Sequence, residues 1–171
     1  MIELEEETIR QWSLSLSDNL SAKFKANFNF KDFDSEEVIY SEFLEKFSAN
    51  YWTTLCEDIE TKQNIIIPIA YDSIIGATNS FFSHTVAVND ENEETEQKLS
   101  FSEHFFATKI SEEILTAFKD TGLNIQHVRN EPKLKLVHPF HEDESITSYM
   151  FKWHINEQLF GDIILCHSHV L

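Results

Sequence analysis

The sequence predicts a single soluble α+β domain in which helices pack on both faces of a mostly antiparallel sheet. Helical and strand-like patterns alternate along the 171 residues, a length that suits one domain with a substantial core. Two strand-like runs, residues 146–155 and 158–166, are separated only by Asn156 and Glu157, which predicts an antiparallel hairpin. Glycine and proline occur only 3 times each, which argues against a loop-rich barrel.

Residues 1–21 predict a weak helical segment ahead of a domain that spans residues 22–171. The apolar side chains of this segment recur three or four positions apart, which is helical spacing, although serines interrupt the pattern. These side chains are Ile9, Trp12, Leu16 and Leu20. Both halves of the domain, residues 22–88 and 99–171, contain strands and helices in a loosely repeated order.

A strand is predicted directly after this segment, over residues 23–30. Its apolar residues alternate strictly with polar ones, so they should share the buried face of one strand. These residues are Phe24, Ala26, Phe28 and Phe30. Asp34 followed by Glu37 has the spacing of a capping box, which predicts that a helix begins there and buries apolar residues within 38–47.

Residues 52–59 and 65–70 predict two further strands, joined by a polar turn. Pro68 cannot donate a hydrogen bond to a neighbouring strand, so we expect the second of them at an edge of the sheet or beside a bulge. A helix is then predicted over residues 72–82.

Residues 89–98 predict an acidic surface loop that joins the two halves. Five of the eight residues in the run 89–96 are acidic and none is apolar, so ordering this run would cost backbone entropy without burial in return. We expect the loop to be mobile and dispensable for folding. It either steers charged partners through its negative potential or is a tolerated insertion without a role.

The second half opens with the strongest helix signal in the chain. Ser100 and Glu103 form a capping box, and Gly122 is a natural residue to follow the last turn. An apolar stripe between them predicts the face that the helix buries. The stripe consists of Phe101, Phe105, Phe106, Ile110, Ile114, Leu115 and Phe118. Strands are expected over residues 123–128 and 134–138, before the closing hairpin.

The formal net charge of −17 bears on the partners and the location of the protein. Its field repels nucleic acid phosphates and anionic lipid, so nucleic acid and membrane surfaces are poor partners. The N-terminus lacks a signal-peptide pattern, and the longest apolar run, residues 65–70, is far too short to span a membrane. We therefore expect a cytoplasmic protein in which Cys56 and Cys166 are buried free thiols.

No catalytic, cofactor or metal motif stands out, so the sequence predicts a protein that is not an enzyme. There is no glycine-rich phosphate loop, no nucleophile elbow and no zinc motif. The pairs His138 with His141 and His167 with His169 have spacings that ligands can have, but a metal site needs three or four ligands. We expect neither cofactor nor metal, and interpret these histidines as surface or strand-face residues.

Five short segments occur in an order that is specific to one protein family. Residues 38–44 (VIYSEFL) precede an apolar run at 65–69 (IIIPI) that leads into a predicted helix. Residues 99–103, 130–132 and 161–166 follow as a helix entry, an N-E-P segment and a closing strand. In this order the segments resemble the middle domain of the flagellar motor switch protein FliM, over nearly all of the chain after residue 21.

The resemblance implies a CheC- and FliM-like α+β fold and a non-catalytic scaffold that binds proteins in motility or chemotaxis. In that family a GGxG loop after the first-half helix contacts the rotor protein FliG. Here the same place has no glycine and reads Phe81, Phe82, Ser83, His84 and Thr85. These five residues are the candidate partner-binding site, with the two phenylalanines as aromatic anchors. The expected binding face consists of the end of the helix over residues 72–82, the loop 83–99 and the start of the next helix. The alternative is that both phenylalanines simply close the core, and for one of the two we expect this.

The implied partners are proteins of the FliG, FliN or CheY kind, with self-association as a further possibility. The family's CheY-capturing peptide is not recognisable in residues 1–20, and its FliN-like C-terminal domain is absent from the sequence. The implied location is a ring assembly in the cytoplasm, peripheral to the cytoplasmic membrane.

Two other functions stay open. One is a ring component of a type III secretion sorting platform, which would share the fold. The other is a CheC- or CheX-like phosphatase with an altered motif, because the E-x-x-N signature of those enzymes does not occur in the sequence.

Overall fold

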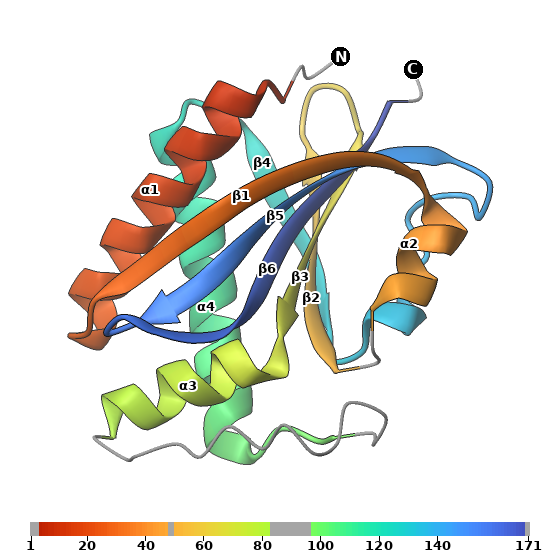
Figure 1. The fold of residues 1–171 in the computed structure, drawn as a ribbon. Helices are drawn as coiled ribbons and strands as arrows, with labels where there is room; N and C mark the ends of the chain where they lie inside the picture. Colours follow the sequence, from red (N-terminus) through yellow and green to blue (C-terminus); the bar gives the residue numbers. More distant parts are fainter. Residues whose placement is uncertain (1–3, 48–49, 83–96, 170–171) are drawn as a thin grey trace.

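The computed structural model describes residues 4–47, 50–82 and 97–169, which form one six-stranded sheet with helices on both faces (Figure 1). The strand order is β1-β5-β6-β3-β2-β4, and every neighbouring pair is antiparallel. The strands are β1 Phe28–Ile39, β2 Tyr51–Asp58, β3 Asn64–Ala70, β4 Ile125–Glu131, β5 Ser145–Ile155 and β6 Gln158–Ser168. The helices are α1 Glu6–Phe24, α2 Tyr40–Lys46, α3 Tyr71–Phe81 and α4 Phe101–Asp120, with a 3₁₀ turn η1 Leu134–Leu136. The predicted α+β class is confirmed.

The two halves of the chain are interleaved within this sheet. The first-half hairpin β2–β3 pairs with the second-half edge strand β4, and the second-half hairpin β5–β6 pairs with the first-half edge strand β1. Strands β3 and β6 join the two hairpins at the centre. Each half thus contains, in order, an edge strand, a short helical segment and a hairpin. In the sheet, the hairpin of each half pairs with the edge strand of the other half.

Two apolar layers lie on opposite faces of the sheet (Figure 1). Helices α1, α3 and α4 cover the main core, where the rings of Trp12 and Phe118 stack with centroids 5.3 Å apart. Helix α2 and the turn η1 cover a smaller core, where the Tyr40 hydroxyl donates a hydrogen bond to the Val137 carbonyl at 2.5 Å. Burial raises the pKa of Tyr40, so this hydroxyl keeps its proton and remains a donor.

The N-terminal helix contributes fully to the main core. It crosses the boundary that the sequence analysis placed after residue 21, since α1 ends only at Phe24. The indole nitrogen of Trp12 donates to the Ile114 carbonyl of α4 at 3.3 Å, and the Ser15 hydroxyl donates to Asp120 at 2.5 Å. Some of the serines that interrupt the apolar pattern therefore contact other elements of the fold.

Two predictions for the first half are wrong. Phe24 lies in α1, and of the alternating phenylalanines only Phe28 and Phe30 belong to β1. No helix begins at Asp34, because residues 28–39 pair with β5 as one long strand. The pairing register shifts just before Asp34, where Asp32 has a φ of 54°. Cross-strand pairing therefore outweighs the local capping signal.

Two further expectations also fail. Strand β3 is central, so Pro68 is not at an edge of the sheet. The residues of β3 between Ile66 and Ile69, which include Pro68, have no pairing partner in β6, and the register is the same on both sides of this gap. Residues 134–138 contain the turn η1 Leu134–Leu136 and no strand, because Leu134 and Val137 are three positions apart and are both buried in the smaller core. The buried residues of this segment therefore follow the three-residue repeat of a 3₁₀ helix and not the two-residue repeat of a strand.

The signals at the ends of the second-half elements are confirmed. The Ser100 hydroxyl accepts a hydrogen bond from the Glu103 backbone N–H at 3.3 Å, and the Glu103 carboxylate accepts one from the Ser100 N–H at 2.5 Å. Gly122 follows α4 with a φ of 80°, a conformation that favours glycine. Asn156 and Glu157, with φ of 50° and 69°, form the predicted two-residue turn of the β5–β6 hairpin.

Candidate functional site: a groove of phenylalanine side chains

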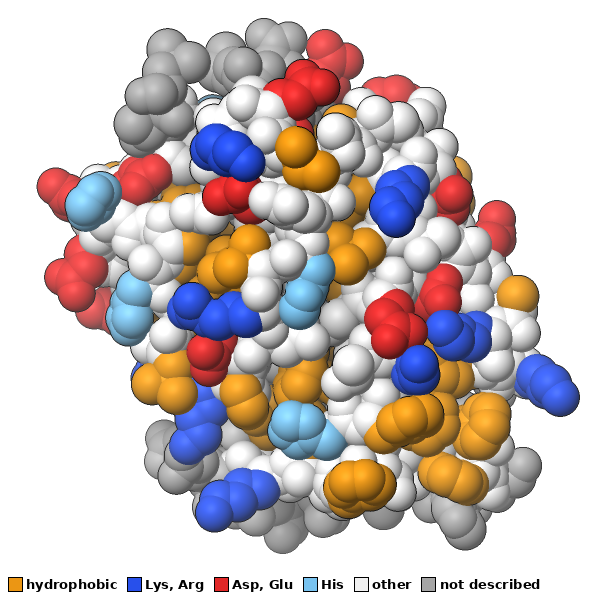
Figure 2. All heavy atoms as spheres, turned by 180° about the vertical axis from the view of Figure 1, so that it is seen from behind, with side chains coloured by type: hydrophobic (Ala, Val, Ile, Leu, Met, Phe, Trp, Pro, Cys, Tyr) orange, Lys and Arg blue, Asp and Glu red, His pale blue; other side chains and the backbone are white. Residues whose placement is uncertain are grey.

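Six phenylalanine side chains gather where α1 and α3 end and α4 begins. Four of them are exposed to solvent: Phe81 is 47% exposed, Phe82 48%, Phe105 54% and Phe101 91%. Figure 2 shows apolar side chains gathered at the lower right, on the side of the molecule where α3 lies. A contiguous apolar surface of this kind marks an interaction site far more often than a single exposed residue does.

These side chains surround a hollow that we call the phenylalanine groove, with a volume of about 380 Å³. Its lining comprises Lys23, Phe24, Phe81, Phe82, Phe101, Ser102, Phe105, Phe106 and Lys109. The volume falls at the lower end of the range of ligand pockets in proteins, so the hollow has room for several apolar groups.

The floor of the groove is organised around Phe106, which is buried. Its ring centroid lies 5.3 Å from that of Phe24, 5.0 Å from Phe81, 5.8 Å from Phe82 and 5.7 Å from Phe105. Tilted and edge-on arrangements at these distances are favourable for aromatic rings. The floor is therefore a packed aromatic cluster, whose outer members remain open to solvent.

Local sequence explains why two phenylalanines of α4 stay outside. The capping box at Ser100 makes Phe101 the first residue of the helix. Phe101 and Phe105 are four positions apart and share one side of α4, whereas Phe106 is turned toward the core. Phe24 is the last residue of α1, so this helix covers Phe106 and then ends.

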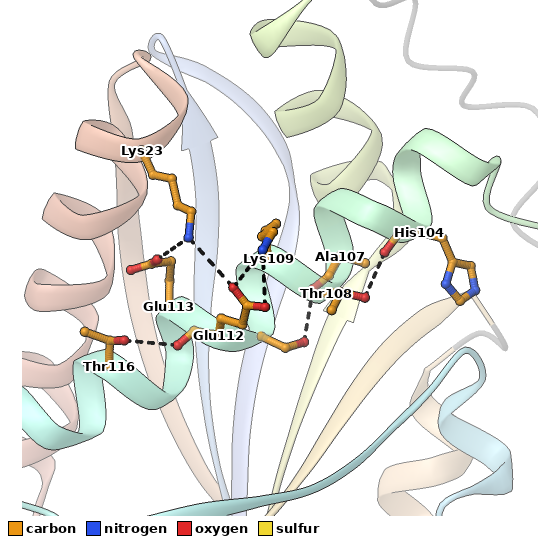
Figure 3. A network of polar contacts seen from close by, with 9 residues as sticks. Lys23, His104, Ala107, Thr108, Lys109, Glu112, Glu113 and Thr116 are labelled. Carbon is orange, nitrogen blue, oxygen red and sulfur yellow. Dashed lines mark hydrogen bonds and ion pairs between the residues drawn. The ribbon is translucent and has the colours of Figure 1, made fainter.

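Two lysines and two glutamates form a network along the rim of the groove (Figure 3). The ammonium of Lys23 lies 2.7 Å from a Glu113 oxygen and 3.9 Å from a Glu112 oxygen. Lys109 lies 3.2 Å from Glu112, and its ammonium stands 5.5 Å from the ring centroid of Phe105. Exposed pairs of this kind add little stability, so the network mainly fixes where the two positive charges lie.

The structure brings part of the predicted site together. Phe81 and Phe82 lie side by side in the groove, with ring centroids 5.3 Å apart. Each packs on Phe106 and keeps nearly half of its surface exposed. The expectation that one of them closes the core is therefore wrong. Ser83, His84 and Thr85 lie outside the described residues, as does the acidic run 89–96.

Sequence reasoning placed the start of this helix on the expected binding face but did not identify the side chains that form the second wall of the groove. Phe101 and Phe105 were assigned to a stripe that α4 would bury, and the structure exposes both. A signal was present, because Phe105 beside Phe106 makes the apolar stripe wider than one buried face of the helix needs. Phe24 was missed because it was assigned to a strand.

The other candidate chemistry does not converge in the described part of the chain. No group of three or more His, Cys, Asp or Glu residues there is placed to hold a metal ion. Burial lowers the pKa of His167, whose ring stacks on Tyr149 with centroids 5.9 Å apart. Cys56 and Cys166 are buried free thiols, as predicted, and burial raises the pKa of Cys56 to about 12. Neither thiol is therefore a thiolate nucleophile at neutral pH.

Comparisons with known proteins place the fold. No protein-family model and no curated protein sequence matches the chain. FliM in a crystal structure of the FliG–FliM complex from H. pylori superposes with a TM-score of 0.77 and 12% identity, over 96% of this chain and 94% of that one. The chain adopts the FliM middle-domain fold. The predicted resemblance is thus confirmed at the level of fold.

Two further structures of this fold are equally extensive matches. The FliM middle domain from Vibrio alginolyticus gives a TM-score of 0.74 at 11% identity, covering 95% of this chain and 91% of that one. FliY from Thermotoga maritima gives 0.70 at 12% identity, covering 98% and 93%. All three comparisons extend over α1, so the N-terminal helix belongs to the FliM-like fold. Among the described residues, no helix has the length and apolarity needed to cross a membrane.

Proposed function

We propose that the chain is a non-catalytic scaffold module of a motility or chemotaxis apparatus, which binds another protein as part of a switch-ring assembly. The observation that carries this proposal is an exposed aromatic groove at the end of α3 on a FliM-like fold. The sequence analysis located the partner contact of the FliM family directly after this helix. The groove is therefore where the resemblance leads one to look for a partner.

The proposed partner is a protein of the FliG kind, with FliN- and CheY-like proteins as further candidates. One solved structure with this fold is a FliG–FliM complex. In this chain, aromatic side chains take the place of the family's glycine-rich loop, so the contact depends on apolar burial. Phe81 and Phe82 have the properties of interface anchors, since they are large, half-exposed and supported from below by Phe106.

The proposal places the protein in the cytoplasm, peripheral to the membrane as part of a ring. It assigns no reaction to the chain, in keeping with the absence of an E-x-x-N motif from the sequence. A type III secretion sorting platform would use the same fold, and the identity of the bound partner separates the two systems.

Binding of purified proteins tests the proposal. The full chain is titrated with the FliG-, FliN- and CheY-type proteins of the same cell, and with the sorting-platform proteins where these are encoded. Saturable binding of a FliG-type protein supports a switch role. Binding of sorting-platform proteins alone, or accelerated dephosphorylation of a phosphorylated CheY-type protein, would contradict it.

A further inference from the structure

The lining of the phenylalanine groove restricts what can occupy it. Apart from Ser102 and two lysines, every described lining residue is a phenylalanine. Such walls offer few hydrogen-bond partners, so an extended peptide laid in the groove would leave backbone N–H and C=O groups buried and unsatisfied. A helix pairs its own backbone groups and presents only side chains, so the groove suits a helix.

The charges at the rim add a second restriction. Lys23 and Lys109 line the groove, and no described lining residue is acidic, in a chain with 30 acidic and 13 basic residues. Glu112 and Glu113, which pair with these lysines, do not belong to the lining. The described lining thus presents two ammonium groups and no carboxylate, and the glutamates that pair with them lie outside it. This arrangement favours a partner whose acidic groups face the lysines.

We propose that the phenylalanine groove binds an amphipathic helix of another protein, with apolar side chains at i, i+3 or i+4 and i+7 and with Asp or Glu beside them. The apolar side chains pack over Phe106 between α3 and α4, and the carboxylates reach Lys23 and Lys109. The inference rests on the proposed function and adds to it the chemistry by which the partner is recognised.

A second copy of the chain is a poorer occupant. The exposed face of α1 carries one large apolar residue among the described residues, Leu14, which is 66% exposed, and so lacks an apolar stripe. Two grooves placed face to face would bring Lys23 and Lys109 of both copies together, and like charges at an interface are unfavourable. The acidic and apolar surface that the groove requires therefore comes from a different protein.

The test uses a displayed library of 18-residue helical peptides, selected for binding to the immobilised full-length chain. The selected peptides are expected to carry apolar residues at helical spacing flanked by Asp or Glu. Each is then titrated by fluorescence anisotropy against the wild-type chain and three variants. The variants are Phe101→Ala with Phe105→Ala in the groove, Leu14→Ala outside it, and the charge exchange Lys109→Glu with Glu112→Lys.

The expected losses differ between the variants. Loss of two exposed aromatic side chains should weaken binding about tenfold or more, while Leu14→Ala changes it less than about twofold. The charge exchange keeps the ion pair within α4 and the net charge, yet places a carboxylate in the groove. It should weaken acidic peptides roughly three- to tenfold and strengthen matched peptides with lysine in place of the acidic residues.

Three results would overturn the inference. These are the recovery of no binding helix, equal binding to the wild type and the Phe101→Ala and Phe105→Ala variant, and a dimer, seen by light scattering, that this variant abolishes. The proposed function has a separate readout. If a FliG-type protein binds the wild type and the groove variant equally well, the inference fails and the proposed function stands. If the selected helices bind the wild type but not the groove variant, and no switch protein binds, the inference holds and the proposed function fails.

Discussion

The two ends of α4 present the same kind of surface to different surroundings. At the C-terminal end, Ile114 and Phe118 have no exposed surface, because α1 lies over them and Trp12 stacks on Phe118. At the N-terminal end, Phe101 and Phe105 are 91% and 54% exposed. Helical spacing specifies which side chains share a side of the helix, but the length of α1 decides which of them are covered.

The difference has a functional meaning. Burying a phenylalanine stabilises a fold by about 1.5–3 kcal/mol, so the exposed end of α4 leaves a comparable gain unused within the chain. A partner can make use of that gain. The covered end therefore holds the domain together, and the uncovered end is available for binding.

The largest expected effect is at the covered end. Phe118→Ala removes a fully buried ring that stacks on Trp12, leaving a cavity in the main core. The free energy of unfolding should fall by about 3–5 kcal/mol, as measured by urea denaturation. A loss below about 1 kcal/mol would mean that α1 does not cover this end of α4 as described.

Ser100→Ala sharpens the comparison at the first turn of α4. The substitution removes the hydroxyl that accepts a hydrogen bond from the Glu103 N–H. Stability should fall by about 1 kcal/mol, within the range for the loss of an N-cap. Because the cap fixes the position of Phe101, the same variant should also bind the partner more weakly. The control is Ser100→Asp, which supplies another N-cap acceptor and should keep both the stability and the partner binding of the wild type.

Phe101→Ala should leave stability almost unchanged, within about 0.5 kcal/mol, because the side chain is 91% exposed. Its effect should fall on binding alone. Thermal melts of Phe101→Ala and Phe118→Ala, measured side by side, compare the stability contributed by the two ends of α4. If Phe101→Ala destabilised the domain by several kcal/mol, the side chain would be packed and the groove would not be open.

A small pH effect is expected where α1 meets the C-terminal end of α4. Hydrogen bonds from Ser15, and also from Asn19, lower the pKa of Asp120. A carboxyl whose pKa is lower in the folded state favours folding above its ordinary pKa, and this contribution is lost as the pH falls through the folded value. Between pH 5 and pH 3, the wild type should lose more stability than Asp120→Asn, in parallel urea titrations. Equal losses would show that Asp120 does not link the two helices.

Most of the fold could be predicted from patterns that are local in the sequence. The capping box at Ser100, the glycine after α4 and the two-residue turn at 156–157 all depend on neighbouring residues, and all are confirmed. The failures involve long-range pairing. Residues 28–39 form one strand because they pair with β5. Nothing in the local sequence between Asp34 and Glu37 indicates this pairing.

The groove was only half predictable for the same reason. The resemblance to FliM directed attention to Phe81 and Phe82, which do line it. The other wall requires knowledge of where α1 ends relative to α4, which no periodicity in either helix contains. An apolar stripe that is one residue wider than a buried face needs, as at Phe105 and Phe106, is the sequence sign of such a surface.

The most direct measurement is hydrogen–deuterium exchange of the chain with and without a bound partner, followed along α4. A partner helix in the groove should slow exchange at the end of α3 and over residues 101–109 of α4. Residues 110–120, already covered by α1, should exchange at an unchanged rate. Slowed exchange confined to α2, β4 or the second half of α4, with the first turns unchanged, would contradict the assignment of the uncovered end as the binding surface.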